Sequence, residues 1–216
     1  MIRLPDSWEW FGDSAILLRH LSKEERIKLL TAKWPPGVID IVSGPSDVVI
    51  QWNEPFVDPR MLDKLMDDAF SLPIAGDANR LHQFHVRYGG ADTDLSLVSA
   101  AVGCKEEEVI QLHSENEYEV VSTGFSPGFA YLSELAKALQ LPRRSVPALK
   151  VKKGAVAIAA GYTGIYPRQS AGGWWVIGYL REDEADQLWR WEKNPPELLQ
   201  IGDRVVFERE KGGGLA

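Results

Sequence analysis

Apolar and polar positions alternate in short blocks along the first part of the chain, and each block predicts one element. Residues 15–18 are continuously apolar, which predicts a strand. Ser22 and Glu25 have the spacing of a capping box in front of an amphipathic helix. Two more apolar stretches, 38–42 and 48–52, are separated by the turn composition Ser-Gly-Pro-Ser and predict two further strands.

A second helix and another strand follow in this pattern. Asp58 and Pro59 suit the cap and first position of a helix. Its apolar face would comprise Leu62, Leu65, Met66 and Phe70. Residues 84–88 alternate between apolar and polar, as a half-buried strand does. The order strand, helix, strand, strand, helix, strand resembles a split βαβ sandwich, so we place an N-terminal α+β domain at 1–89 and a boundary at Gly89-Gly90.

The second domain, 90–216, has a different pattern. Asp94 could cap a helix over 95–102, and a second short helix is expected at 105–112. Short strands then alternate with glycine and proline, at Val120-Val121, Ala155–Ala159, Trp174–Ile177 and Val205–Phe207. Six glycines lie between positions 154 and 178, a density typical of tight turns. We expect a mainly antiparallel barrel or sandwich with few helices, and a frayed end at 211–216.

Composition adds a charge asymmetry to this picture. The 216 residues are 44% apolar and 25% charged, which is ordinary for a globular protein, and the net charge is −7. This acidic balance argues against a nucleic-acid partner. Residues 135–181 nevertheless contain no acid, so we expect this segment to face an anionic ligand or an acidic partner. We also expect most of its eight basic side chains to lie on one face of the barrel. These are Lys137, Arg143, Arg144, Lys150, Lys152, Lys153, Arg168 and Arg181.

Several classes of site are disfavoured by the sequence. The N-terminus lacks a signal-peptide core and no apolar run approaches a membrane span, so a soluble cytoplasmic protein without a membrane partner is expected. Cys104 is the single cysteine, which excludes an internal disulfide. His82 and His85 would point to opposite faces of a strand, so no metal site is expected. No phosphate-binding glycine loop of a known pattern is present.

The segment Gly124-Phe125-Ser126-Pro127-Gly128 matches the nucleophile elbow of serine hydrolases in form only. In that elbow the backbone N–H after the serine helps to bind the oxyanion, and Pro127 has none. All four histidines, at 20, 82, 85 and 113, also precede Ser126. We therefore interpret 124–128 as a loop that sets local shape.

Two other features leave alternatives open. His113 lies near an expected helix end and could transfer protons, although a lone histidine is more often structural. Two loops rich in glycine, hydroxyl groups and aromatics, 161–167 and 170–174, lie inside the acid-free segment. They could bind an anionic or amide ligand, or they could be hairpin loops whose glycines satisfy turn geometry.

A series of motifs in order along the chain carries a resemblance to a known family. They are HSENEYEV at 113–120, GFSPGFAYL at 124–132, LPRR at 141–144, GAVAIA at 154–159, TGIYP at 163–167, SAGGWWVIG at 170–178 and GDRVVF at 202–207. Three earlier segments extend the series, GDSAILL at 12–18, PPGVIDIV at 35–42 and YGGADTDL at 88–95. The chain resembles the family of KipI and the 5-oxoprolinase B subunit, also named allophanate hydrolase subunit 1 or carboxyltransferase domain, subdomain C/D.

This resemblance implies an α+β fold with a small N-terminal domain and a C-terminal cyclophilin-like β-barrel. It also implies a homologous partner that resembles KipA or the 5-oxoprolinase C subunit, and a third, lactam-hydrolysing subunit. Such complexes convert 5-oxoproline to glutamate with ATP, and related domains occur in urea carboxylase, so ATP is expected at the level of the complex and not on this chain alone. The alternative is a KipI-like regulator that binds and inhibits a sensor histidine kinase.

The resemblance also suggests site residues in this chain. In the resulting hypothesis His113 moves protons, Arg143 and Arg144 attract a carboxylate or phosphate, and loops position the ligand. The expected ligand-binding residues are Arg143, Arg144, Thr163, Gly164, Tyr166, Ser170, Gly172, Gly173 and Trp174, and the loop-shaping residues are Phe125, Pro127 and Gly128. The chain departs from the family pattern at Ala171, Tyr179 and Leu180.

Overall fold

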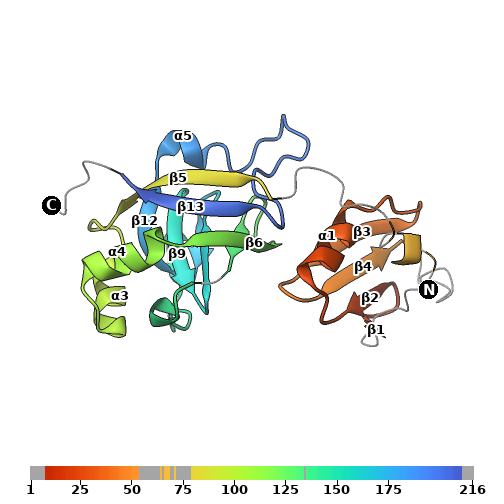
Figure 1. Ribbon diagram of the computed structural model, residues 1–216, viewed down its shortest axis with the longest axis horizontal. Coiled ribbons are helices and arrows are strands. Elements are labelled where there is room, and N and C mark those ends of the chain that lie inside the picture. The colour runs from red at the N-terminus through yellow and green to blue at the C-terminus, as the bar shows by residue number, and fades with distance from the viewer. Residues whose placement is uncertain are drawn as a thin grey trace. The chain divides into compact units, whose positions relative to one another are not determined.

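The computed structural model describes residues 8–53, 64, 66–68, 71, 79–133 and 135–210, and the chain forms two compact units, 1–78 and 79–216 (Figure 1). The helix expected after Asp58 and Pro59 begins outside the described residues, as does the terminal segment 211–216. None of the described helices combines the length and the apolar character needed to cross a membrane.

The N-terminal unit is an antiparallel sheet with a helix, and all of its elements named below except β1 are predicted by the apolar pattern. The strand order is β1-β2-β4-β3. The bounds are β1 Trp8–Trp10, β2 Ala15–Leu18, α1 Lys23–Thr31, β3 Val38–Ser43 and β4 Val48–Trp52. The capping box is confirmed, because the Ser22 hydroxyl accepts from the Glu25 N–H at 3.3 Å and the Glu25 carboxylate accepts from the Ser22 N–H at 2.7 Å. Apolar side chains from the strands and α1 form one buried cluster.

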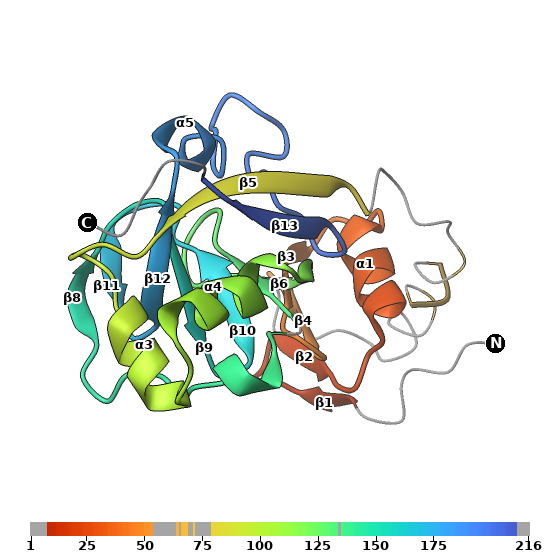
Figure 2. The same cartoon turned by 60° about the vertical axis from the view of Figure 1, so that its left-hand side comes forward.

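The second unit is a closed barrel with strand order β10-β7-β6-β13-β5-β12-β9, so the expected barrel is confirmed (Figure 1). Its strands are β5 Leu81–Tyr88, β6 Glu117–Thr123, β7 Ala130–Leu132, β9 Ala155–Ala159, β10 Tyr162–Ile165, β12 Trp175–Leu180 and β13 Arg204–Arg209. The helical elements are α3 Leu95–Val102, α4 Glu106–Ser114, η1 Lys137–Leu139 and α5 Glu182–Ala185. A separate ribbon, β8 Ala148–Val151 with β11 Ser170–Gly172, lies at the side of the barrel near β12 (Figure 2).

Strand β5 corrects the domain assignment made from the sequence. It pairs in parallel with β13 and antiparallel with β12, so it belongs to the barrel and not to the N-terminal sheet. The two units divide between Ala78 and Asn79, eleven residues before the boundary placed at Gly89-Gly90. Gly89 and Gly90 both have positive φ, at 77° and 100°, because they form the turn between β5 and α3 inside the barrel unit.

Asp94 does not cap helix α3 with its side chain, although its position in the sequence predicts a cap. It occupies the N-cap position of α3 but makes no side-chain capping bond. Its carboxylate instead accepts from the backbone N–H of Val176 at 2.9 Å and pairs with the guanidinium of Arg144. Asp94 therefore joins the start of α3 to strand β12 and to the loop that carries Arg143.

The acid-free segment 135–181 does not remain uncompensated in the folded chain. Acids from outside the segment pair with four of its cations: Arg144 with Asp94, Lys152 with Asp92, Lys153 with Asp186 and Arg181 with Asp183. Within the described part of the chain, no ion pair is formed by Lys137, Arg143, Lys150 or Arg168. Half of the local positive charge is therefore neutralised, and the other half remains available for anions.

Candidate functional site

Six of the residues singled out from the motifs meet around one small cavity at the barrel. The cavity has a volume of about 60 Å³. It is lined by Phe125, Phe129, Tyr131, Arg143, Tyr166, Gly172, Gly173 and Trp174. We call it the Arg143 pocket. Phe129 and Tyr131 were not among the expected site residues, although their spacing in the aromatic motif at 124–132 is a signal that could have identified them.

Edge-to-face contacts between aromatic rings build the walls of the Arg143 pocket. The ring of Phe129 lies at the centre, with centroid distances of 5.4 Å to Tyr166 and 5.5 Å to Trp174. Phe125 packs against it from the loop side at 5.3 Å. Burial raises the pKa of the Tyr166 hydroxyl above its ordinary value, so Tyr166 is a neutral phenol at physiological pH. The aromatic walls of the pocket therefore carry no charge.

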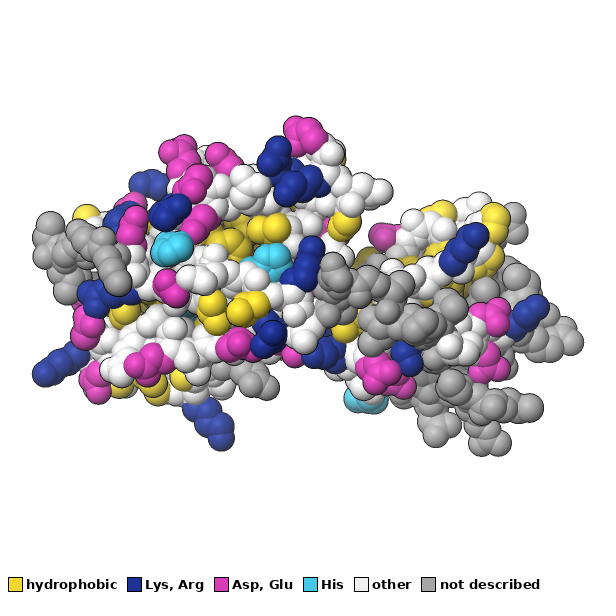
Figure 3. Space-filling model, turned by 45° about the horizontal axis from the view of Figure 1, so that its top comes forward, with side chains coloured by type: hydrophobic (Ala, Val, Ile, Leu, Met, Phe, Trp, Pro, Cys, Tyr) yellow, Lys and Arg dark blue, Asp and Glu magenta, His cyan; other side chains and the backbone are white. Residues whose placement is uncertain are grey.

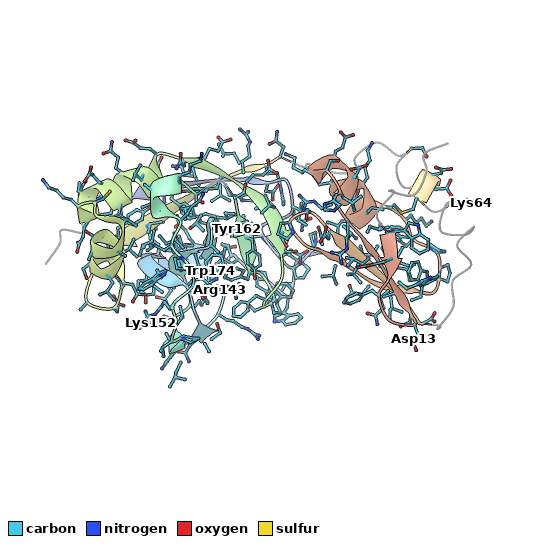
Figure 4. The ribbon with its side chains drawn as sticks, turned by 90° about the horizontal axis from the view of Figure 1, so that it is seen from below. Asp13, Lys64, Arg143, Lys152, Tyr162 and Trp174 are labelled. Atoms are coloured by element: carbon cyan, nitrogen blue, oxygen red, sulfur yellow. The ribbon has the colours of Figure 1, made fainter. Side chains whose placement is uncertain are left out.

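Arg143 supplies the charge of this pocket. Its side chain is exposed and lies close to Trp174 (Figure 4). Among the residues that the structure describes, no acid forms an ion pair with it. A guanidinium beside aromatic walls and without a carboxylate partner is suited to bind an anion with two oxygens in a bidentate manner.

Two glycines keep the pocket open. A Cβ on Gly164 would lie 2.9 Å from the carbonyl oxygen of Ala130 and 3.0 Å from the Phe129 ring, so only glycine fits beside this wall of the pocket. A Cβ on Gly172 would collide with the hydroxyl of Tyr166. The neighbouring Gly173 has more space, because the nearest atom to its Cβ would be Pro147 Cγ at 3.8 Å.

Adjacent alanine substitutions test this packing. Gly172→Ala should lower the free energy of unfolding by about 1–3 kcal/mol, because Tyr166 is almost fully buried and must tilt into Phe129. Gly173→Ala should change it by less than about 0.5 kcal/mol. Urea denaturation measures both effects, and near-ultraviolet circular dichroism should report altered aromatic packing for Gly172→Ala alone. Equal stability and equal spectra for the two variants would contradict this description of the pocket.

The loop 124–128 has a shape that fits the role expected for it. Phe125 has a φ of 68° and Gly128 a φ of 82°, and the two ends of the loop are joined by a hydrogen bond from Gly124 N–H to the Phe129 carbonyl at 3.2 Å. The Ser126 hydroxyl is buried and has no hydrogen-bond partner in the described part of the chain. No base therefore activates Ser126 in this conformation.

His113 does not lie in the Arg143 pocket, which argues against the proton-transfer role suggested for it. It is completely buried inside the barrel. Its Nε2 lies 2.8 Å from the hydroxyl of Thr163, which donates to the Ala157 carbonyl, and its Nδ1 lies 2.7 Å from the Tyr88 hydroxyl. One neutral tautomer satisfies all these groups, with Nε2–H donating to Thr163 and Nδ1 accepting from Tyr88. Burial lowers the pKa of His113 to about 3, so the ring is neutral and structural.

The remaining expected ligand-binding residues also serve the framework. Arg144 pairs with Asp94 and lies over the Trp175 ring, 5.4 Å from its centroid. Thr163 is fully buried against His113. Ser170 lies on the ribbon, and its hydroxyl is buried without a hydrogen-bond partner among the described residues. None of these three lines the Arg143 pocket.

Three residues depart from the family pattern, and the structure gives a local reason for Tyr179 and Leu180 but not for Ala171. Tyr179 lies under the cations of Arg87 and Lys152, at 5.6 and 5.8 Å from its ring centroid, and donates its hydroxyl to the Asp92 carbonyl. Leu180 is buried in the barrel core. Ala171 is exposed on the ribbon, and nothing in the structure explains it.

The two histidines of β5 contact acidic side chains and not the Arg143 pocket. His82 contacts the buried carboxylate of Asp203 at 3.1 Å, while His85 contacts Glu184 at 2.7 Å. Burial alone would raise the pKa of Asp203, but hydrogen bonds from His82 and Arg80 outweigh it and lower that pKa. Figure 3 shows histidine on the barrel unit surrounded by acidic and basic side chains. No cluster of three metal-binding side chains occurs in the described part of the chain.

Sequence relatives place this architecture in a known family. The model of the carboxyltransferase domain, subdomain C and D, matches residues 8–199. The 5-oxoprolinase B subunit of Escherichia coli O157:H7 is 33% identical over 211 residues, covering 94% of this chain and 95% of that protein. The protein of the same name from Haemophilus influenzae is 36% identical over 172 residues, covering 79% of this chain and 78% of that protein.

Solved structures share the fold. The crystal structure of TTHA0988 superposes with a TM-score of 0.73 at 32% identity; the match covers 95% of this chain but only 41% of that longer chain. PH0987 from Pyrococcus horikoshii matches with a TM-score of 0.56 at 26% identity, covering 95% of this chain and 98% of that one. The Kluyveromyces lactis urea carboxylase, at 14% identity and a TM-score of 0.68 over 94% of this chain and 22% of that one, shows the fold alone. The chain thus belongs to the family of the carboxyltransferase domain, subdomain C and D, as its motifs indicate.

Proposed function

We propose that this chain is one component of an ATP-dependent amide hydrolase complex of the 5-oxoprolinase type, and that the Arg143 pocket binds the carboxylate of its substrate. The observation that carries the proposal is an unpaired guanidinium at an aromatic pocket built from family motifs. The chain's similarity to the 5-oxoprolinase B subunit over 94% of its length supports the choice of substrate.

The chemistry of 5-oxoproline suits the pocket. The molecule is a small lactam ring with one carboxylate. Arg143 would hold the carboxylate through charge-assisted hydrogen bonds. Phe129 and Trp174 would pack against the ring and exclude water from it.

Neither ATP nor the lactam-cleaving groups fit this pocket. Arg143 is its only lining cation in the described structure, and the residues around it are aromatic or glycine. A triphosphate needs several hydrogen-bond donors or a phosphate-binding glycine loop. The pocket offers one cation, and the sequence contains no such loop of a known pattern. We therefore assign ATP binding and amide hydrolysis to other members of a cytoplasmic complex. These would be a homologous partner resembling KipA or the 5-oxoprolinase C subunit, and a third, lactam-hydrolysing subunit.

Reconstitution tests this function. The chain is mixed with its cognate partner and third subunit, and glutamate release from 5-oxoproline and ATP is followed. Arg143→Gln should raise the KM for 5-oxoproline about tenfold, because it removes one charge-assisted contact. Lys137→Gln, which removes an unpaired cation outside the pocket, should leave KM unchanged. Full activity of the complex without this chain would refute the proposed function, and an unchanged KM in Arg143→Gln would refute the assignment of the pocket.

A further inference from the structure

A second cavity of the barrel unit is larger than the Arg143 pocket and shares no lining residue with it. Its volume is about 310 Å³, at the lower end of the range for small-molecule sites. The lining residues are Pro127, Lys153, Pro167, Arg168, Ala185, Asp186, Trp189 and Trp191. We call it the Trp189 cavity.

The walls of the Trp189 cavity are flat and apolar. Trp189 and Trp191 pack edge to face, with centroids 5.2 Å apart and an interplanar angle of 84°. Trp191 is 79% exposed, so its ring is accessible to a ligand. Gly128 packs closely behind Trp189, because a Cβ there would lie 3.0 Å from the Leu188 carbonyl and 3.1 Å from Trp189 Cβ.

The charge of the Trp189 cavity is positive. The ammonium of Lys153 pairs with the carboxylate of Asp186, so these two residues cancel. Arg168 is exposed and has neither an ion pair nor a side-chain hydrogen bond to any residue in the described part of the chain. One uncompensated guanidinium therefore faces the apolar walls.

The indole N–H of Trp189 adds an unused donor. It is buried and has no acceptor among the described residues. Buried donors in proteins are normally satisfied, and an orphaned one marks a place where an acceptor group can be gained. The cavity thus combines an apolar surface with a free cation, and one of its lining tryptophans carries an unsatisfied buried N–H.

We propose that the Trp189 cavity is a binding site for a small organic anion with a flat apolar body, separate from the site proposed for 5-oxoproline. The guanidinium of Arg168 binds the anionic group. The apolar body packs between the tryptophan pair and the two prolines. This assignment does not depend on the reaction of the complex.

Two fluorescent probes of the same shape test the proposal on the full chain. Anilinonaphthalene sulfonate carries the anion, and phenylnaphthylamine is its neutral counterpart. The sulfonate should bind saturably at one site and more tightly than the neutral probe. Arg168→Gln should raise the dissociation constant of the sulfonate about tenfold and change that of the neutral probe by less than about twofold. Trp191→Ala should weaken both probes, because it removes an apolar wall.

Two matched variants locate the binding. Lys137→Gln removes another unpaired surface cation, and Arg143→Gln removes the cation of the other pocket; neither should affect the probes. Absence of saturable binding would overturn the proposal. So would an unchanged sulfonate affinity in Arg168→Gln, an unchanged affinity of both probes in Trp191→Ala, or an equal loss in Arg143→Gln or Lys137→Gln.

Discussion

Lowering the pH from about 7 to about 4 should destabilise the protein by roughly 3 kcal/mol through His113 alone. An unfolded histidine has a pKa near 6.5, whereas burial lowers the pKa of His113 to about 3 in the folded barrel. Below pH 6.5 the unfolded chain therefore binds a proton that the native chain refuses. Stability falls by about 1.4 kcal/mol per pH unit through this window, and the effect levels off once the pH drops below the folded pKa.

The control is His113→Gln, which keeps a donor and an acceptor for Thr163 and Tyr88 but does not titrate. This variant should be less stable than the wild type at neutral pH. Between about pH 7 and 4 its free energy of unfolding should fall by roughly 3 kcal/mol less than that of the wild type. Urea denaturation at a series of pH values measures both slopes. Other titrating groups, including Asp203, are common to the two proteins and cancel in the comparison. Parallel curves would show that folding does not lower the pKa of His113.

Gly178→Ala should destabilise the barrel by about 3 kcal/mol, the upper end of ordinary overpacking. The added Cβ would lie 2.8 Å from the Arg87 carbonyl oxygen and 3.1 Å from Tyr88 Cα. These are backbone atoms of β5, so no rotamer change can relieve the contact. Gly178 pairs with Tyr88 next to a bulge in the β12–β9 ladder, and Tyr88 in turn holds His113. Strand β12 or β5 must therefore shift as a whole to make room for the added methyl group.

Gly173→Ala is the matched substitution for this experiment, because Gly173 also lacks a positive φ but has open space around its Cβ. It should change the unfolding free energy by less than about 0.5 kcal/mol. Urea midpoints at neutral pH compare the two variants directly. A Gly178→Ala protein as stable as Gly173→Ala would show that β5 and β12 are packed less closely than described.

Local patterns predicted most elements of the fold, because capping, alternation and turn chemistry act over a few residues. The helix after Ser22 and the strand at 84–88 are examples. The assignment of the strand at 84–88 to the N-terminal domain was wrong, because its parallel partner, β13, lies more than a hundred residues further along the chain. No local signal records such a pairing. Gly89-Gly90 has the composition of a boundary, yet a tight turn inside a domain needs the same residues.

The site was predictable where the residue type determines the role. Gly172, Trp174 and Tyr166 were expected at a pocket and line one. The sequence could not separate Arg143 from Arg144, because only the fold brings Asp94 to the second arginine. His113 is of a residue type common in catalysis, but it lies in the core of the barrel. Its hydrogen-bond partners, Tyr88 and Thr163, come from two strands that are distant in the sequence.

The pairing of β5 with β13 has a consequence for the order of events during synthesis. β5 is the first barrel strand to leave the ribosome and β13 is the last, so the ring stays open until residues 204–209 have emerged. The β1–β4 sheet is complete within residues 8–52 and can form long before. Until the final strand inserts between β5 and β6, both of these strands expose an unpaired edge, the kind of surface on which nascent chains aggregate.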